Sequence, residues 1–117
     1  MKIILYGTAS DTTELGERIA ALPGFCYRDV RVVAFSDYDG LVAGLDASPP
    51  DLVIIAMDGA DGMEGVIAVR SAVGNIPVVW FSNDKGFGVQ SYRLGCAYFH
   101  EKPVSHEVLT SAISKCV

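Results

Sequence analysis

The stretch from Asp51 to Gly65, DLVIIAMDGADGMEG, constrains the fold more than any other part of the 117-residue chain. Its apolar run breaks off abruptly into acidic residues and glycines. A short run that is apolar at every position is typical of a parallel strand covered by helices on both faces. Sheets of this kind bind ligands in a crevice beyond the carboxyl ends of their strands. The sequence therefore predicts a buried central strand over 51–57 that ends at such a crevice.

The rest of the chain alternates short apolar runs with helical patterns. The runs predict four more strands, at 2–6, 28–35, 76–82 and 97–101. Apolar residues at helical spacing predict helices that end near Leu22, contain Leu41–Leu45, stop at Gly74, cover 86–95 and contain Val108–Cys116. Strand and helix repeated five times predict one domain, residues 1–117, with a three-layer, doubly wound α/β fold. For this length we expect five parallel strands in the flavodoxin-like order 2-1-3-4-5.

In that order the crevice opens between the first and third strands. We expect it to be lined by residues that follow the first, third and fourth strands, with Lys102 nearby: Gly7 to Asp11, Ala56 to Asp61, and Ser82 with Asn83.

Charge and cysteine content exclude several classes of function. The net charge is -5 and no basic run is present, so we expect no direct contact with nucleic acid by this chain. No apolar run is long enough for a signal peptide or a membrane span, which predicts a cytoplasmic protein without membrane contact. The three cysteines, Cys26, Cys96 and Cys116, lack metal-ligand spacing, and we expect reduced thiols.

Two segments of the second half, IPVVWFSND and YRLGCAYFHEKPV, carry a resemblance. They resemble the receiver domains of two-component response regulators, the CheY-like family. The matching features are Ser82 at the end of the fourth strand, the turn Leu94–Gly95–Cys96, the aromatic Phe99, and Lys102 followed by Pro103. The KPV ending and the tyrosine before LGC look most like receivers of LytTR-type regulators.

The resemblance implies phosphoryl transfer to an aspartate at the end of the third strand, with a divalent cation held by that aspartate and by an acidic pair after the first strand. In this chain the acceptor position falls on Ala56, and the acidic pair falls on Gly7 and Thr8. None of these three has a carboxylate. We therefore expect an atypical pseudo-receiver that is not an enzyme, lacks a cofactor and a metal, and acts through protein contacts.

Asp58 offers a first alternative. It lies two residues beyond Ala56, so in a strand it points to the same face, about 6.6 Å further on. A phosphorylatable receiver would use Asp58 as acceptor, with Mg²⁺ held by Asp11, Asp58 and Asp61.

The hydroxyl-rich segment from Thr8 to Thr13 offers a second alternative. Thr8, Ser10, Thr12 and Thr13 resemble the phosphate loop of flavodoxins, which implies binding of flavin mononucleotide (FMN). Asp11 stands where that loop has glycine. The simpler interpretation is helix capping, including a capping box from Asp11 to Glu14.

The resemblance also implies partners. These are a histidine kinase or an effector domain, with a homodimer through the 86–116 face. A DNA-binding effector domain for transcription regulation would lie outside this chain.

Overall fold

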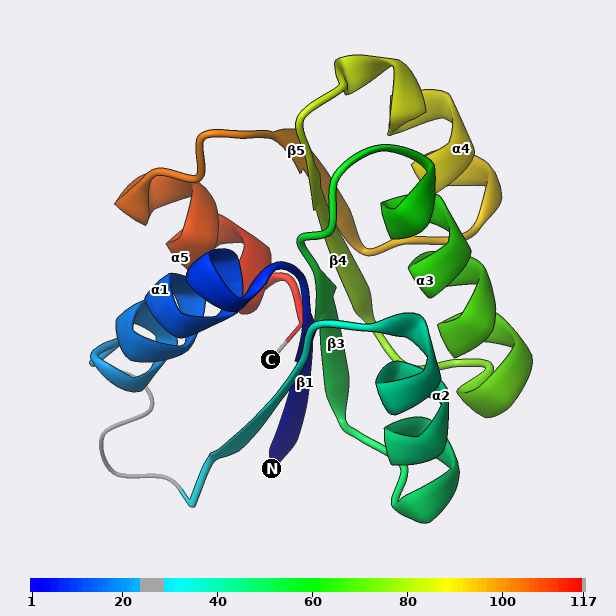
Figure 1. Ribbon diagram of the computed structural model, residues 1–117. Coiled ribbons are helices and arrows are strands. Elements are labelled where there is room, and N and C mark those ends of the chain that lie inside the picture. The colour runs from blue at the N-terminus through cyan, green and yellow to red at the C-terminus, as the bar shows by residue number, and fades with distance from the viewer. Residues whose placement is uncertain (24–28, 117) are drawn as a thin grey trace.

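The computed structural model describes residues 1–23 and 29–116 and contains a five-stranded parallel sheet. The strands follow the order β2-β1-β3-β4-β5, which confirms the predicted doubly wound, flavodoxin-like α/β fold (Figure 1). Their bounds are β1 Lys2–Tyr6, β2 Arg31–Phe35, β3 Leu52–Ile55, β4 Val78–Ser82 and β5 Tyr98–Glu101.

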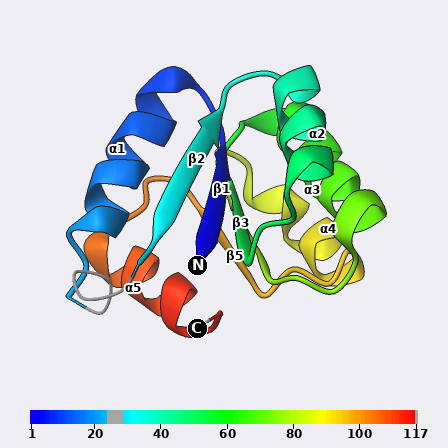
Figure 2. The same ribbon diagram turned by 90° about the horizontal axis from the view of Figure 1, so that it is seen from below.

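Helices cover both faces of the sheet, as Figure 2 shows from below. The helices α1 (Ala9–Ala20) and α5 (His106–Ser114) lie on one face. On the other face lie α2 (Tyr38–Ala47), α3 (Gly59–Val73) and α4 (Gly88–Arg93), the last preceded by the short 3-10 helix η1 (Lys85–Phe87). Each face has its own hydrophobic core, and β1, β3 and β4 contribute side chains to both. No helix within the described residues is long and apolar enough to cross a bilayer.

The element boundaries differ from the sequence predictions by a few residues. The strand predicted at 51–57 ends at Ile55, although the amide of Ala56 still donates to the carbonyl of Tyr6 at 2.7 Å. The second strand begins at Arg31 and not at residue 28, which lies outside the described residues. The capping box from Asp11 to Glu14 is wrong, because Thr8 is the N-cap of α1 and accepts from the amide of Asp11.

Glycine allows the first turns of α3 to pack directly on the sheet. A Cβ at Gly62 would lie 2.2 Å from the carbonyl oxygen of Met57, and a Cβ at Gly65 would lie 2.7 Å from the ring of Tyr6. The first contact is with backbone, which has little freedom to move away. The start of α3, and with it the turn after β3, is therefore held in place by close contact.

Arg70 joins three separate backbone segments. Its guanidinium donates to the carbonyl groups of Leu94 and Gly95 in the turn before β5, and to those of Gly74 and Ile76 between α3 and β4. Charged donors make stronger hydrogen bonds to carbonyls than neutral ones do. Arg70 thus connects the amino-terminal edges of β4 and β5 with the end of α3.

Replacing Gly62 by alanine should destabilise the fold by about 1–3 kcal/mol, because the new methyl group collides with the Met57 carbonyl. Gly16 in α1 is the matched control, since its Cβ would only touch Leu5 at an ordinary 3.7 Å. Gly16→Ala should therefore stabilise by roughly 0.5–1 kcal/mol through helix propensity. Urea unfolding measures both; two changes of the same sign would contradict the packing argument.

Replacing Arg70 by methionine should lower the free energy of unfolding by about 2 kcal/mol or more, because four carbonyl groups lose a charged donor. Arg93→Met is the control, since the Arg93 side chain is exposed and bonds to none of the described residues. Its effect should stay within about 0.5 kcal/mol. Equal effects in denaturant unfolding would show that Arg70 does not join these segments.

Candidate functional site

The carboxyl ends of β1, β3 and β4 meet at the predicted crevice, and Ala56 and Gly7 close its floor. Both residues are buried, Ala56 at 1% exposure. A Cβ on Gly7 would lie 3.3 Å from the methyl group of Ala56. The acceptor position and one position of the acidic pair therefore pack closely against each other, and neither supplies a carboxylate.

Lys102 occupies the space above this floor. Its Nζ lies 2.8 Å from Oδ2 of Asp11, 2.7 Å from Oδ1 of Asp58 and 2.6 Å from the carbonyl oxygen of Ala56. An ammonium group has three hydrogen atoms to donate. The three acceptors come from the start of α1 and from the turn after β3. The lysine therefore connects both segments to the end of β5, and all three of its N–H groups have an acceptor.

The pKa of Lys102 reflects this surrounding. Burial alone lowers the pKa of the ammonium group, but hydrogen bonds and charge attraction from Asp11 and Asp58 outweigh burial and raise the pKa. The lysine is therefore firmly positive at neutral pH. The side chains of Asp11 and Asp58 are 34% and 46% exposed, so solvent partly screens the pair.

The remaining residues that the resemblance singled out are also engaged. Ser82 is fully buried, and its hydroxyl accepts from the amide of Asp84 at 3.1 Å. Asn83 accepts from the amide of Gly59 at 3.2 Å. Phe99 packs edge-on against Trp80 at 5.4 Å between ring centroids. The peptide bond between Lys102 and Pro103 is cis.

The structure brings together part of the predicted crevice but not all of it. Asp11, Ala56, Asp58 and Lys102 converge on one point, whereas Ser82 faces its own turn. Sequence reasoning placed Lys102 nearby but missed that it bonds Asp11, a residue 91 positions away. This pairing could have been expected only from the sheet order, which brings the carboxyl ends of β1, β3 and β5 to the same edge.

A divalent cation, which the resemblance to receiver domains implies, does not fit these residues. The positions of the acidic pair, Gly7 and Thr8, have no carboxylate, and Ala56 has none. Asp11 and Asp58 each already have one carboxylate oxygen paired with the ammonium group of Lys102. Among residues 1–23 and 29–116, no three acidic, histidine or cysteine side chains gather closely enough to hold a metal ion, and this includes Asp61.

The threonines after β1 serve α1. Thr8 accepts from the amide of Asp11, and the buried hydroxyl of Thr12 donates to the carbonyls of Thr8 and Ala9. Capping thus engages two of the four hydroxyls proposed for flavin phosphate. The carboxylate of Asp11 lies beside the same turn, where it would repel a phosphate group.

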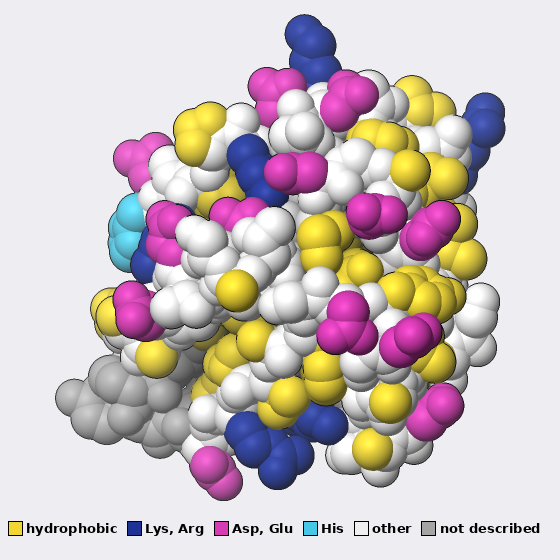
Figure 3. Space-filling model, in the orientation of Figure 1, with side chains coloured by type: hydrophobic (Ala, Val, Ile, Leu, Met, Phe, Trp, Pro, Cys, Tyr) yellow, Lys and Arg dark blue, Asp and Glu magenta, His cyan; other side chains and the backbone are white. Residues whose placement is uncertain are grey.

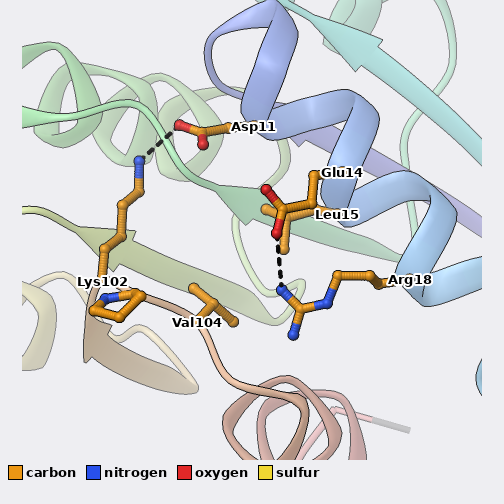
Figure 4. A pocket seen from close by; sticks show the side chains of 7 residues that line it. Asp11, Glu14, Leu15, Arg18, Lys102 and Val104 are labelled. Atoms are coloured by element: carbon orange, nitrogen blue, oxygen red, sulfur yellow. Dashed lines mark hydrogen bonds and ion pairs between the residues drawn. The ribbon is translucent and has the colours of Figure 1, made fainter.

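A groove of about 330 Å³ lies beside the lysine, between α1 and the segment after β5 (Figure 4). Asp11, Glu14 and Arg18 line its α1 side, and Glu14 and Arg18 form an ion pair at 3.6 Å. Val104 lies on the opposite side. Acidic and basic side chains line the groove in equal number. Lys102 lies at its edge, where its ammonium group remains bonded to Asp11, Asp58 and the Ala56 carbonyl.

The cysteines show no sign of reactivity in the described residues. Burial raises the pKa of the Cys96 thiol to about 11, against a smaller lowering by Arg70. Burial also raises the pKa of Cys116. Both thiols are therefore protonated at neutral pH, whereas thiolates are the reactive form. Cys26 lies outside the described residues.

Comparison with known proteins establishes the fold. No protein-family model matches the sequence, and no curated protein matches it. Among solved structures, NtrX from Brucella abortus in complex with ADP has a TM-score of 0.80 at 19% identity over 98% of this chain. The pilus assembly protein CpaE2 from Sinorhizobium meliloti has a TM-score of 0.76 at 18% identity over 100% of it. A LuxR-family two-component response regulator from Aurantimonas has a TM-score of 0.74 at 20% identity over 97% of it.

These structures differ in how much of their own length the chain matches. The chain spans 25% of NtrX, 81% of the response regulator and 100% of CpaE2. At such identities the likeness shows a shared three-dimensional arrangement, and function has to be argued from the site.

Replacing Lys102 by methionine should destabilise the fold by about 1–2 kcal/mol at neutral pH, because Asp11 and Asp58 lose the charge between them. Lys85 on η1 is exposed and its side chain pairs with none of the described residues, so Lys85→Met is the control. The raised pKa means that the stabilisation is present below the ordinary value of 10.5 and is lost as pH rises through the folded value.

Denaturant unfolding between pH 7 and pH 11 measures this difference. Adding Asp58→Asn to Lys102→Met should recover part of the loss, since it removes one of the two unneutralised carboxylates. The difference in unfolding free energy between wild type and Lys102→Met should shrink as the pH rises above 10.5. A difference that stays constant there would contradict the electrostatic account.

Proposed function

We propose that this chain is a receiver-like module of a two-component or related signalling pathway that acts through protein contacts without phosphorylation of an aspartate. The shared fold supports the signalling role, and the crevice supports the lack of phosphorylation. One observation carries the second part. The ammonium group of Lys102 already binds Asp11, Asp58 and the carbonyl of Ala56, the position that would have to receive a phosphoryl group.

Phosphoryl transfer needs a nucleophile, a cation to offset repulsion, and donors for the phosphoryl oxygens. Ala56 has no nucleophile, and Gly7 packs onto its methyl group. The donor of Lys102 is saturated, and the hydroxyl of Ser82 is buried. Each of the three requirements is unmet at the acceptor position, which favours an output that depends on a fixed surface.

Asp58 remains the alternative acceptor because its side chain is 46% exposed at the start of α3. Its carboxylate makes no capping hydrogen bond to α3 and faces Lys102. An acyl phosphate at Asp58 would replace the carboxylate that Lys102 pairs with at 2.7 Å, so this ion pair would have to rearrange. We infer that this cost keeps Asp58 unmodified.

The partners that we propose are a histidine kinase or an effector domain, reached through the 86–116 face. Val89 and Tyr92 on α4 are 61% and 87% exposed, which supports a contact surface there. A LytTR-type relationship, a DNA-binding effector domain and a homodimer remain proposals of the same kind.

Incubation with acetyl phosphate and Mg²⁺, followed at once by intact-mass measurement, tests the proposal. We expect no phosphoryl adduct on the wild-type chain. The response regulator of the same fold from Aurantimonas, treated in parallel, controls for reagent activity. An adduct that disappears in Asp58→Ala would replace the proposal by a phosphorylatable receiver.

A further inference from the structure

The outer surface of α2 and α3 has an unusual composition. Every residue in Tyr38–Ala47 and 59–69 is acidic, glycine or hydrophobic, counting tyrosine as hydrophobic. Seven acidic residues and no lysine, arginine or histidine lie between Arg31 and Arg70. Helix surfaces usually mix both signs of charge with neutral polar residues. The nine basic residues of the chain therefore all lie elsewhere.

Hydrophobic side chains are exposed on the same surface. Ile67 on α3 is 42% exposed and Tyr38 at the start of α2 is 44% exposed, so two of the four large exposed hydrophobic residues of the described chain lie here. Figure 3 shows hydrophobic and acidic side chains interspersed over α2 and α3, with lysine and arginine at the margins. We call the exposed residues Tyr38, Asp39, Asp46, Asp61, Glu64 and Ile67 the α2–α3 surface.

Several carboxylates of this region raise the pKa of the same tyrosine, Tyr6. Burial raises the pKa of Tyr6, and the charges of Asp61, Asp37 and Glu64 raise it further. These three come from the start of α2 and the first turns of α3, so their fields overlap although they are far apart in sequence. No cation within the described residues pairs with any of them.

We propose that the α2–α3 surface binds a cationic amphipathic segment of a partner protein. Exposed apolar area favours a partner with hydrophobic side chains, and uncompensated carboxylates favour lysine and arginine around them. Nucleic acids and anionic membranes carry the wrong sign. A second copy presenting the same surface would bring its own carboxylates against these, which opposes self-association through this face.

The inference rests on the proposed role as a protein-contact module but not on the crevice. Asp11 and Lys102 take no part in it, and a phosphoryl adduct on Asp58 would leave the prediction for Ile67 and Glu64 unchanged. The phosphorylation test of the proposed function and the binding test of this surface can therefore fail independently of each other.

Fluorescence anisotropy with labelled peptides tests the proposal on the intact chain. The probe is an amphipathic peptide of lysine and leucine, about 15 residues long to match α3. Its counterpart has glutamate in place of lysine. We expect the lysine peptide to bind, the glutamate peptide not to bind, and added salt to weaken the complex.

Two substitutions separate this surface from general charge attraction. Ile67→Ser and Glu64→Gln should each weaken binding by about fivefold, the effect of removing one interface anchor. The controls Ala20→Ser and Glu17→Gln on α1 change exposed residues outside both proposed contact surfaces and should have little effect. Thermal melts verify that each variant is folded.

Three outcomes would overturn the inference. The first is an equal loss for Glu17→Gln and Glu64→Gln, which indicates attraction to overall charge. The second is unchanged affinity in Ile67→Ser. The third is a wild-type dimer in sedimentation velocity that Ile67→Ser dissociates, which would make a second copy the occupant.

Discussion

The ammonium group of Lys102 organises the carboxyl edge of the sheet. A lysine donates three hydrogen bonds, and this one finds three acceptors on two other segments of the chain. The start of α1, the turn after β3 and the end of β5 are thereby connected at one atom. Burying an ammonium group is costly unless opposite charges surround it, and Asp11 and Asp58 supply those charges. The arrangement is complete without any added ion.

The fold and the contents of its crevice are set by different features of the chain. In a doubly wound sheet the crevice follows from topology, and any side chains at the strand ends will meet there. Here Lys102 meets the carboxylates of Asp11 and Asp58 above a floor formed by Ala56 and Gly7. The likeness to NtrX, CpaE2 and a response regulator thus concerns the fold. The chemistry of the crevice has to be argued from its own residues.

The sequence predicted the elements and their order well, because strand periodicity and turn residues are local signals. Trp80 lies within the apolar run predicted as a strand at 76–82 and is fully buried, and Ala56 follows β3 directly, as expected of the acceptor position. Local signals misplaced the cap of α1, since Thr8 and Asp11 are both good caps and only geometry decides between them.

Contacts between distant residues could not be read from the sequence in the same way. Arg70 falls within the helix predicted to stop at Gly74, yet its role comes from carbonyl groups in the turns before β4 and β5. The pairing of Lys102 with Asp11 likewise depends on the sheet order and has no signature in spacing. The acidic and hydrophobic composition of α2 and α3 was visible in the sequence, but their shared outer surface was not.

The glycines of α3 have a consequence for the dynamics of the molecule. Gly59, Gly62 and Gly65 lower the intrinsic helix propensity of its first turns, so these turns depend on their contacts with Met57 and Tyr6. A segment that is helical only while docked is the one whose amides open first to exchange with solvent. It also begins beside Asp58. A helix that depends on its contacts with the sheet therefore joins the crevice to the acidic outer surface.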